Sequence, residues 1–251
     1  MGASAFSSGE AIGVGWRTFK ANIWLMISAF LLFMVMDKGL GGLVSMVMDN
    51  GLGGLVKLSD SASPLTLAAL YLVGYVLGRF GQLGFTHLAL RVVDGEEATI
   101  GDLFSQGRLL VRAVLATIVY LGIVFGGFLL LIVPAIIWGI KYQDYIYVGG
   151  FLLLIVPAII WGIKFQYYIY AIVDEDAGVM ESLKRSSALT RGEKLNLFRY
   201  GLLCGLVGLL GTLALGVGVL AAAPTIALAS AYVYRRLVAS DAERREFVWP
   251  E

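Results

Sequence analysis

Three polar side chains within long apolar stretches are the residues of this sequence best placed to bind a ligand. Arg79 and Gln82 lie one helical turn apart in GYVLGRFGQLGF, and Lys164 follows Pro157 in another apolar run. Ionisable groups inside a membrane are costly and often functional. We therefore interpret Arg79, Gln82 and Lys164 as a candidate intramembrane polar site. Two alternatives stay open: Arg79 extends to the membrane surface, or Lys164 forms a structural ion pair.

The segment DAGVMESLKRSSALTRG carries a second candidate site, for docking of a partner. Its apolar residues fall on one helical face, and Glu181 and Arg185 have the i, i+4 spacing of a surface ion pair. We predict an amphipathic surface helix here. Its polar side chains Glu181, Lys184 and Arg185 are then the candidate docking residues.

The acidic triplet Asp174, Glu175 and Asp176 precedes this helix. Three carboxylates could bind a divalent cation, but no histidine or further carboxylate group with ligand spacing lies nearby. Carboxylates also cap helix N-termini, where the macrodipole favours them. We interpret the triplet as a cap, with Asp176 at the start of the helix and Gly192 at its end.

No constellation of residues indicates catalysis. The sequence has one histidine, His87, and one cysteine, Cys204, so it offers neither a multi-histidine metal site nor a disulfide framework. It contains no nucleophile elbow, zinc-protease motif, phosphate-binding loop or dinucleotide fingerprint. We expect no catalytic residue, no metal and no cofactor. The formal net charge of +1 gives no basic footprint for nucleic acid.

The composition predicts the helices that must position these residues. The chain is 59% hydrophobic and 15% charged, and no charged residue lies between Arg112 and Lys141 or between Arg199 and Arg235. Apolar runs longer than about 18 residues are typical of membrane-spanning helices. The second gap is long enough to fold back near Gly216–Gly218 or Pro224. We predict an all-α, polytopic transmembrane helix bundle.

A pattern of an amphipathic helix followed by a long apolar region occurs three times. The amphipathic stretches are GEAIGVGWRTFKAN, TIGDLFSQGR and the docking segment. In the first, Ser7 and Glu10 have capping-box spacing, and a span is expected from about Ile23. We predict a single integral membrane domain, 1–251, of about six spans. Its units are approximately 1–92, 93–175 and 176–238, and a polar tail covers 239–251.

The distribution of positive charge predicts the orientation in the membrane. Most of the 19 Lys and Arg residues fall before the first span, between the units or at the C-terminus, and the opposite side receives only Lys38 and Lys57. Positive charge accumulates on the cytoplasmic side of membrane proteins. We expect a multi-pass protein of a prokaryotic cytoplasmic membrane, with both termini in the cytoplasm.

Two segments of the sequence are duplicated almost without change. Residues 35–44 match 47–56, and residues 126–147 match 149–170. The longer copy would supply one more crossing and reverse the topology of everything after it, against the charge rule. We predict that the added segment doubles back as a re-entrant or interfacial hairpin near Tyr147–Gly150. Whether the duplications are natural or artefactual stays open.

The segment IKFQYYIYAIVDEDAGVMESLKRSSALTRGEKLNLF, with GEAIGVGWRTFKAN and DGEEATIGDLF, resembles an uncharacterised family of prokaryotic polytopic membrane proteins. That family has a proline-led helix with a basic residue, then V-D-E, then A-L-K-R-S-W-x-L-T-x-G. These elements match Pro157 with Lys164, residues 173–175, and residues 182–192, with Ser187 where an aromatic residue is common. The resemblance implies six spans, architectural motifs and a relationship to the membrane domain of glycerophosphoryl diester phosphodiesterases.

The function expected from these observations is a non-enzymatic scaffold or accessory factor in an envelope or transport process. The alternative is a carrier or channel for a small solute or lipid, which the polar site around Arg79 and Lys164 would serve. A membrane-embedded hydrolase is a distant third reading. Expected partners are the lipid bilayer and a membrane protein or a second copy of the chain.

Overall fold

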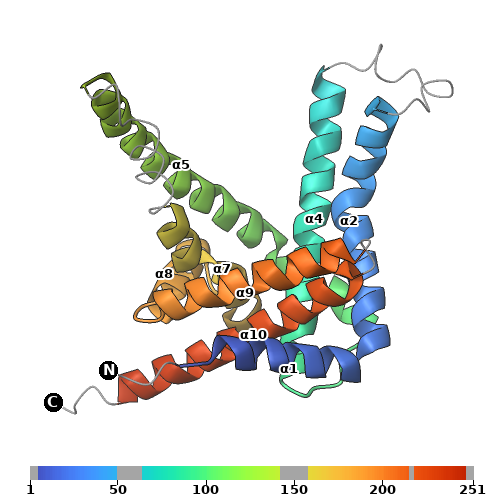
Figure 1. The fold of residues 1–251 in the computed structure, drawn as a ribbon. Coiled ribbons are helices and arrows are strands. Elements are labelled where there is room, and N and C mark those ends of the chain that lie inside the picture. Colours follow the sequence, from blue (N-terminus) through green and yellow to red (C-terminus); the bar gives the residue numbers. More distant parts are fainter. Residues whose placement is uncertain (1–4, 50–63, 142–157, 215–217, 247–251) are drawn as a thin grey trace.

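The computed structural model describes residues 5–49, 64–141, 158–214 and 218–246, and within them the chain is all-helical, with no strand (Figure 1). Residues 158–165 are also helical. The elements in chain order are α1 (Ser8–Ala21), α2 (Ile23–Asp49), α4 (Pro64–Val93), the 3-10 turns η2 (Ile100–Phe104) and η3 (Gly107–Leu109), α5 (Leu110–Lys141), α7 (Tyr168–Glu175), α8 (Val179–Leu189), α9 (Lys194–Leu213) and α10 (Val219–Glu246).

Helix α1 is the predicted N-terminal amphipathic helix, and it packs along α10 (Figure 1). A Cβ on Gly15 would lie 2.5 Å from the carbonyl oxygen of Thr225, so only glycine permits this contact. The chain breaks at Asn22, and α2 leaves at 99° to α1. Ser7 occupies the N-cap position without a side-chain capping bond. The predicted capping box is therefore wrong: Glu10 accepts a hydrogen bond from the Tyr232 hydroxyl instead, at 2.9 Å.

Helices α2 and α4 form a closely packed pair (Figure 1). A Cβ on Gly78 would lie 2.6 Å from Oδ1 of Asp37, and the rings of Phe33 and Phe85 stack with centroids 5.5 Å apart. At the lower end of this pair, α1 and α10 join α2 and α4 in the core. Its fully buried side chains include Phe19, Met26, Leu88, Leu228, Tyr234 and Leu237.

The second predicted surface helix is not an amphipathic α-helix. Its residues form the two 3-10 turns η2 and η3, in which Leu103 is buried and Ile100 and Phe104 are exposed. The reason is the approach of α4: a Cβ on Gly84 would lie 1.9 Å from the carbonyl oxygen of Leu103. The backbone of η2 thus rests directly on α4, and Thr99 with Asp102 forms a capping box at its start.

Helix α5 and the segment after Pro157 form an antiparallel hairpin. The hydroxyls of Thr117 and Tyr168 lie 2.9 Å apart, and the rings of Tyr120 and Tyr168 stack with centroids 5.6 Å apart. Further along α5, a Cβ on Gly127 would overlap the ring of Trp161. Residues further along α5 therefore contact residues earlier in the returning segment, so the two helical arms run antiparallel. The chain returns to the end at which α5 begins.

The duplicated segments lie partly in this hairpin. The first long copy continues α5 to Lys141, and the described part of the second includes residues 158–165 and the start of α7. A helix of 32 residues is about 48 Å long, against a hydrocarbon core of about 30 Å. The predicted turn near Tyr147–Gly150 lies outside the described residues, and so does much of the second short copy, 47–56.

Helices α9 and α10 fold back on each other at the first of the two predicted positions. The hydroxyls of Tyr200 and Ser230 lie 2.9 Å apart, and a Cβ on Gly211 would lie 2.8 Å from that of Ala222. These contacts make the two helices antiparallel. Pro224 lies inside α10, five residues after the start of the helix.

Two helices among the described residues are long and apolar enough to cross a membrane, Ile100–Gly127 and Lys194–Leu213. The bent pair Ser8–Ala21 and Ile23–Asp37 makes a third if it counts as one broken span. Large apolar side chains are exposed along α5 and α9, among them Ile118, Phe125, Leu206 and Leu210. The finer expectation of about six spans in three units stays a prediction.

Candidate functional site

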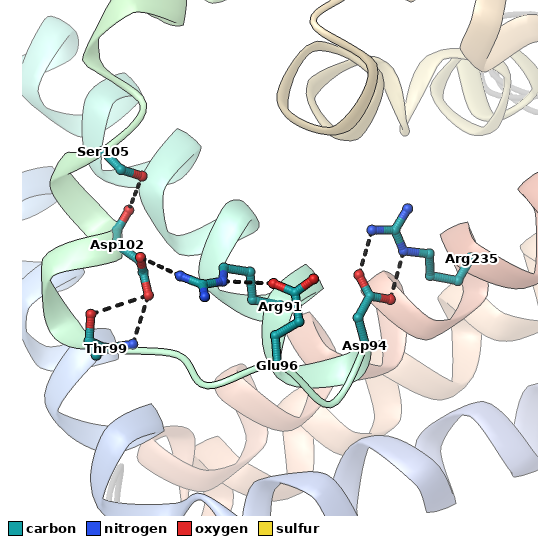
Figure 2. A network of polar contacts seen from close by, with 7 residues as sticks. All are labelled: Arg91, Asp94, Glu96, Thr99, Asp102, Ser105 and Arg235. Atoms are coloured by element: carbon teal, nitrogen blue, oxygen red, sulfur yellow. Dashed lines mark hydrogen bonds and ion pairs between the residues drawn. The ribbon is translucent and has the colours of Figure 1, made fainter.

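The carboxyl end of α4 is tied to the following turn by Arg91 (Figure 2). Arg91 Nη1 lies 2.6 Å from Asp102 of η2, and Arg91 Nε lies 3.0 Å from Glu96. The other oxygen of Asp102 accepts a hydrogen bond from the backbone N–H of Thr99 at 2.7 Å. One carboxylate thus starts η2 and fixes it to α4.

Arg235 of α10 joins two carboxylates from different helices. Its Nε and Nη2 bind both oxygens of Asp94, just after α4, at 2.9 and 2.5 Å (Figure 2). Its Nη1 lies 2.7 Å from Oδ1 of Asp174, in α7. The buried Tyr234 also donates to Asp174, at 3.1 Å. Bidentate pairing of this kind fixes geometry as well as charge.

Arg185 of α8 lies between Glu175 of α7 and Asp241 of α10. Its Nε contacts both oxygens of Glu175, at 2.8 and 2.9 Å, and its Nη1 lies 2.6 Å from Asp241. Burial alone would lower the pKa of Arg185, but the hydrogen bonds to Glu175 and Asp241 outweigh it and raise that pKa. The side chain is 19% exposed, so water screens these pairs only in part.

Asp176, just after α7, forms ion pairs with two arginines. Arg108 of η3 lies 3.0 Å from one oxygen of Asp176, and Arg112 of α5 lies 2.6 Å from the other. Together, five arginines connect the ends of α4, α5 and α7 and the interior of α8 and α10: Arg91, Arg108, Arg112, Arg185 and Arg235. We call these five arginines and their carboxylates the arginine network.

The predicted capping role of the acidic triplet is wrong. Asp176 ends α7 in the left-handed conformation, with φ of 52°, and Gly178 is the N-cap residue of α8. The three successive carboxylates instead pair with arginines of different elements. Within the described ranges, no three His, Cys, Asp or Glu side chains are grouped so that they could hold a metal ion.

The docking residues of α8 have unequal surroundings. The predicted pair of Glu181 with Arg185 does not form: Glu181 accepts the Gly178 N–H at 3.3 Å, and Arg185 belongs to the arginine network. Long-range carboxylates outcompete the local partner because α7 and α10 pack against α8. Of the three docking residues, only Lys184 is an exposed cation outside the network.

The predicted intramembrane site is divided between two grooves. Arg79 donates to Gln82 at 2.6 Å, and its guanidinium lies 5.0 Å from the centre of the Tyr75 ring. Both side chains line a groove of about 470 Å³ between α2 and α4, which Asp37 also lines. Lys164 does not line this groove. Arg79 and Gln82, one helical turn apart, thus share one groove and a hydrogen bond, whereas Lys164 lines another groove.

Lys164 shares the second groove with Lys184. This groove has a volume of about 350 Å³ and lies between α5, the helical segment 158–165 and α8. We call it the basic groove, and its lining residues are Ile123, Lys164, Phe165, Met180, Leu183, Lys184, Ser187, Ala188 and Arg191. The α8 positions recur at three- and four-residue intervals, so one helix face forms the wall.

Sequence reasoning missed several residues of both sites. Arg91, Asp94, Arg191 and Arg235 are not among the candidate residues that the sequence indicates. A signal existed for Arg191, because it follows Lys184 at the spacing of one helical face. None existed for the pairing of Asp94 with Arg235, which lie 141 residues apart.

The structure thus defines an all-helical protein with helices capable of spanning a membrane. Over residues 9–240 the sequence matches the family described as Domain of unknown function (DUF7847), and the chain belongs to this family. Searches of curated proteins and of solved structures gave no match. The relationship to phosphodiesterase membrane domains stays a prediction.

Proposed function

We propose that this protein is a multi-pass protein of the cytoplasmic membrane that acts as a non-enzymatic scaffold or accessory factor. The arginine network carries the proposal. Its ion pairs link α7 to η3, α5, α8 and α10, and α10 to the turn after α4, and side chains such as Asp241 and Asp174 in it are only 13% and 18% exposed. A fixed surface of this kind suits the docking of a partner.

The membrane location is supported by the exposed apolar faces. Phe125 of α5 is 65% exposed and Leu210 of α9 is 65% exposed, each in a helix long enough to cross a bilayer. Patches of this kind are rare on monomeric soluble proteins. Charged groups of different predicted units also pair directly, Arg91 with Asp102, Arg112 with Asp176 and Arg235 with Asp94, which supports a common side of the membrane for them.

A rigid network argues against the carrier alternative. Alternating access moves one set of helices against another around a fixed site. Here Arg235 pairs α10 with both α4 and α7, and Arg112 pairs α5 with the end of α7. Each such movement would separate several ion pairs at once. The scaffold is therefore the function that the geometry favours.

Purification of the full-length protein in a mild detergent, followed by native mass spectrometry, tests the scaffold. We expect a protein partner at fixed stoichiometry that is retained in Arg236→Gln and lost or weakened in Arg235→Gln. Arg236 is the matched control, because it is exposed and forms no ion pair with the described residues. Equal retention of the partner by both variants would show that the arginine network is not part of the docking surface.

The carrier remains the second candidate because of the groove that Arg79 and Gln82 line between α2 and α4. Its test is uptake of labelled anionic and zwitterionic solutes into vesicles that contain the purified protein. Uptake that is lost in Arg79→Leu but kept in Arg17→Leu, an exposed arginine of α1, would favour the carrier. Absence of uptake by a partner-bound protein would favour the scaffold.

A further inference from the structure

The basic groove gathers three cations and no carboxylate. Lys164, Lys184 and Arg191 all line it, and none of its lining residues is acidic. The ion pairs of the described residues include none of these three side chains, although the five arginines of the network each bind a carboxylate. Like charges around one cavity repel each other, so an anion that enters it is stabilised by all three.

The remaining walls of the groove are apolar. Phe165 and Leu183 are buried beside it, and Met180 is 54% exposed. The ammonium of Lys164 lies 5.0 Å from the centre of the Phe165 ring, so the charge sits against an aromatic surface rather than in open water. A small inorganic anion would gain nothing from such walls. A ligand with both an anionic and an apolar part would use the whole surface.

The groove also continues onto a helix that can cross a membrane. Ile123 lines it, and Ile123 lies in the apolar stretch Ile100–Gly127. Leu115, eight residues before Ile123 and about 80° around the helix from it, is 47% exposed and lies at the edge of the apolar face that continues to Ile118 and Phe125. The cations thus lie next to an exposed apolar helix face, which is the arrangement of a phospholipid with its headgroup at one end and its acyl chains along the helix.

We propose that the basic groove binds the phosphate-bearing headgroup of an anionic phospholipid. Lys164, Lys184 and Arg191 donate hydrogen bonds to the phosphate, and the Ser187 hydroxyl is a further donor in the same wall. The acyl chains lie along the exposed face of α5. The proposal rests on the membrane location proposed above. A lipid bound in the basic groove holds α8 against the bilayer.

Native mass spectrometry of the full-length protein, titrated in detergent with phosphatidylglycerol or phosphatidylcholine, tests the site. We expect a preference for phosphatidylglycerol, and each charge removed weakens its binding about fivefold. The variants are Lys184→Gln, Arg191→Gln and the double variant Lys164→Gln/Lys184→Gln. Lys194→Gln is the matched control, an exposed lysine that does not line the groove. Thermal unfolding of each variant checks that it is folded.

Equal binding of the two lipids, or unchanged phosphatidylglycerol binding in Lys184→Gln and Arg191→Gln, would overturn the proposal. Inorganic phosphate is a third arm, and displacement of the lipid by phosphate at similar concentrations would assign the site to a free anion instead. Flotation of the protein with phosphatidylcholine vesicles after an alkaline wash tests the membrane location separately. A protein that floats but shows no lipid preference disproves the site alone.

Discussion

The arginine network and the basic groove use similar residues in opposite ways. In the network, Arg185 and Arg235 are each bound to two carboxylates from different elements. In the groove, Lys164, Lys184 and Arg191 face a cavity without a carboxylate. Arg185 and Lys184 are neighbours in sequence, yet one joins three helices and the other lines a cavity. Their roles are set by the helix face on which each lies.

Charge pairing therefore separates structure from binding in this molecule. A carboxylate beside an arginine neutralises its charge within the chain. The pair therefore stabilises the fold and has little net charge with which to bind an ionic ligand. Cations gathered without carboxylates cost stability through repulsion, which a bound anion would relieve. The comparison predicts that substitutions in the network lower stability and, through the altered helix positions, weaken partner docking, whereas those in the groove change lipid binding without loss of stability.

The largest effect is expected at Arg185. Arg185→Gln removes the cation between Glu175 and Asp241, and we expect the free energy of unfolding to fall by about 2 kcal/mol, between the values for buried and for surface pairs. Lys184→Gln is the control, with a change within about 0.5 kcal/mol. Thermal unfolding in detergent measures both. Equal losses of unfolding free energy in Arg185→Gln and Lys184→Gln would show that the two regions do not differ in their contribution to stability.

A smaller loss is expected at Arg235, because its side chain is 32% exposed and that of Asp94 is 29% exposed. Arg235→Gln should lower the free energy of unfolding by about 1 kcal/mol, and Arg236→Gln should leave it unchanged. The double variant with Asp94→Asn completes a thermodynamic cycle. Strict additivity in that cycle would mean that the pair contributes nothing.

The sequence predicted local features better than it predicted partners. The all-helical fold, the break between α1 and α2 near Ile23 and the reversal before α10 followed from apolar length, helical spacing and glycine. The partners did not. Local spacing paired Arg185 with Glu181, whereas tertiary packing brings Asp241 to it from 56 residues away. The 3-10 turns at 100–109 also depend on α4, which no local pattern of these residues reveals.

The candidate polar site shows the same limit. Arg79 and Gln82 lie one turn apart on one helix, so local spacing alone places them together, and they form a hydrogen bond at 2.6 Å. Lys164 was assigned to the same site because it is also a cation in an apolar run. Only the packing of α5 against the segment 158–165 shows that it faces Lys184 and Arg191 instead. Shared chemistry in a sequence does not establish a shared site.

A carboxylate added to the basic groove tests the comparison with the arginine network more sharply than removal of a cation does. Ser187→Glu places a carboxylate in the wall of the basic groove, where it can pair with Lys184 or Arg191. We expect stability to change by less than about 0.5 kcal/mol, slightly upward, since an exposed pair contributes little. Preference for phosphatidylglycerol should disappear, as native mass spectrometry would show. Ser187→Gln, of equal size and no charge, should retain that preference.

The smallest effect is expected from deletion of one long copy, residues 126–148. The arginine network closes across this region, since Arg112 before it binds Asp176 after it at 2.6 Å. Because the chain already returns to the end at which α5 begins, a shorter hairpin leaves both regions in place. In a Cys204→Ser background, a cysteine at position 184 should react with an impermeant reagent equally in the full-length and deleted chains. Opposite labelling would mean that the copy supplies a crossing, which would separate Arg112 from Asp176 by the thickness of the membrane.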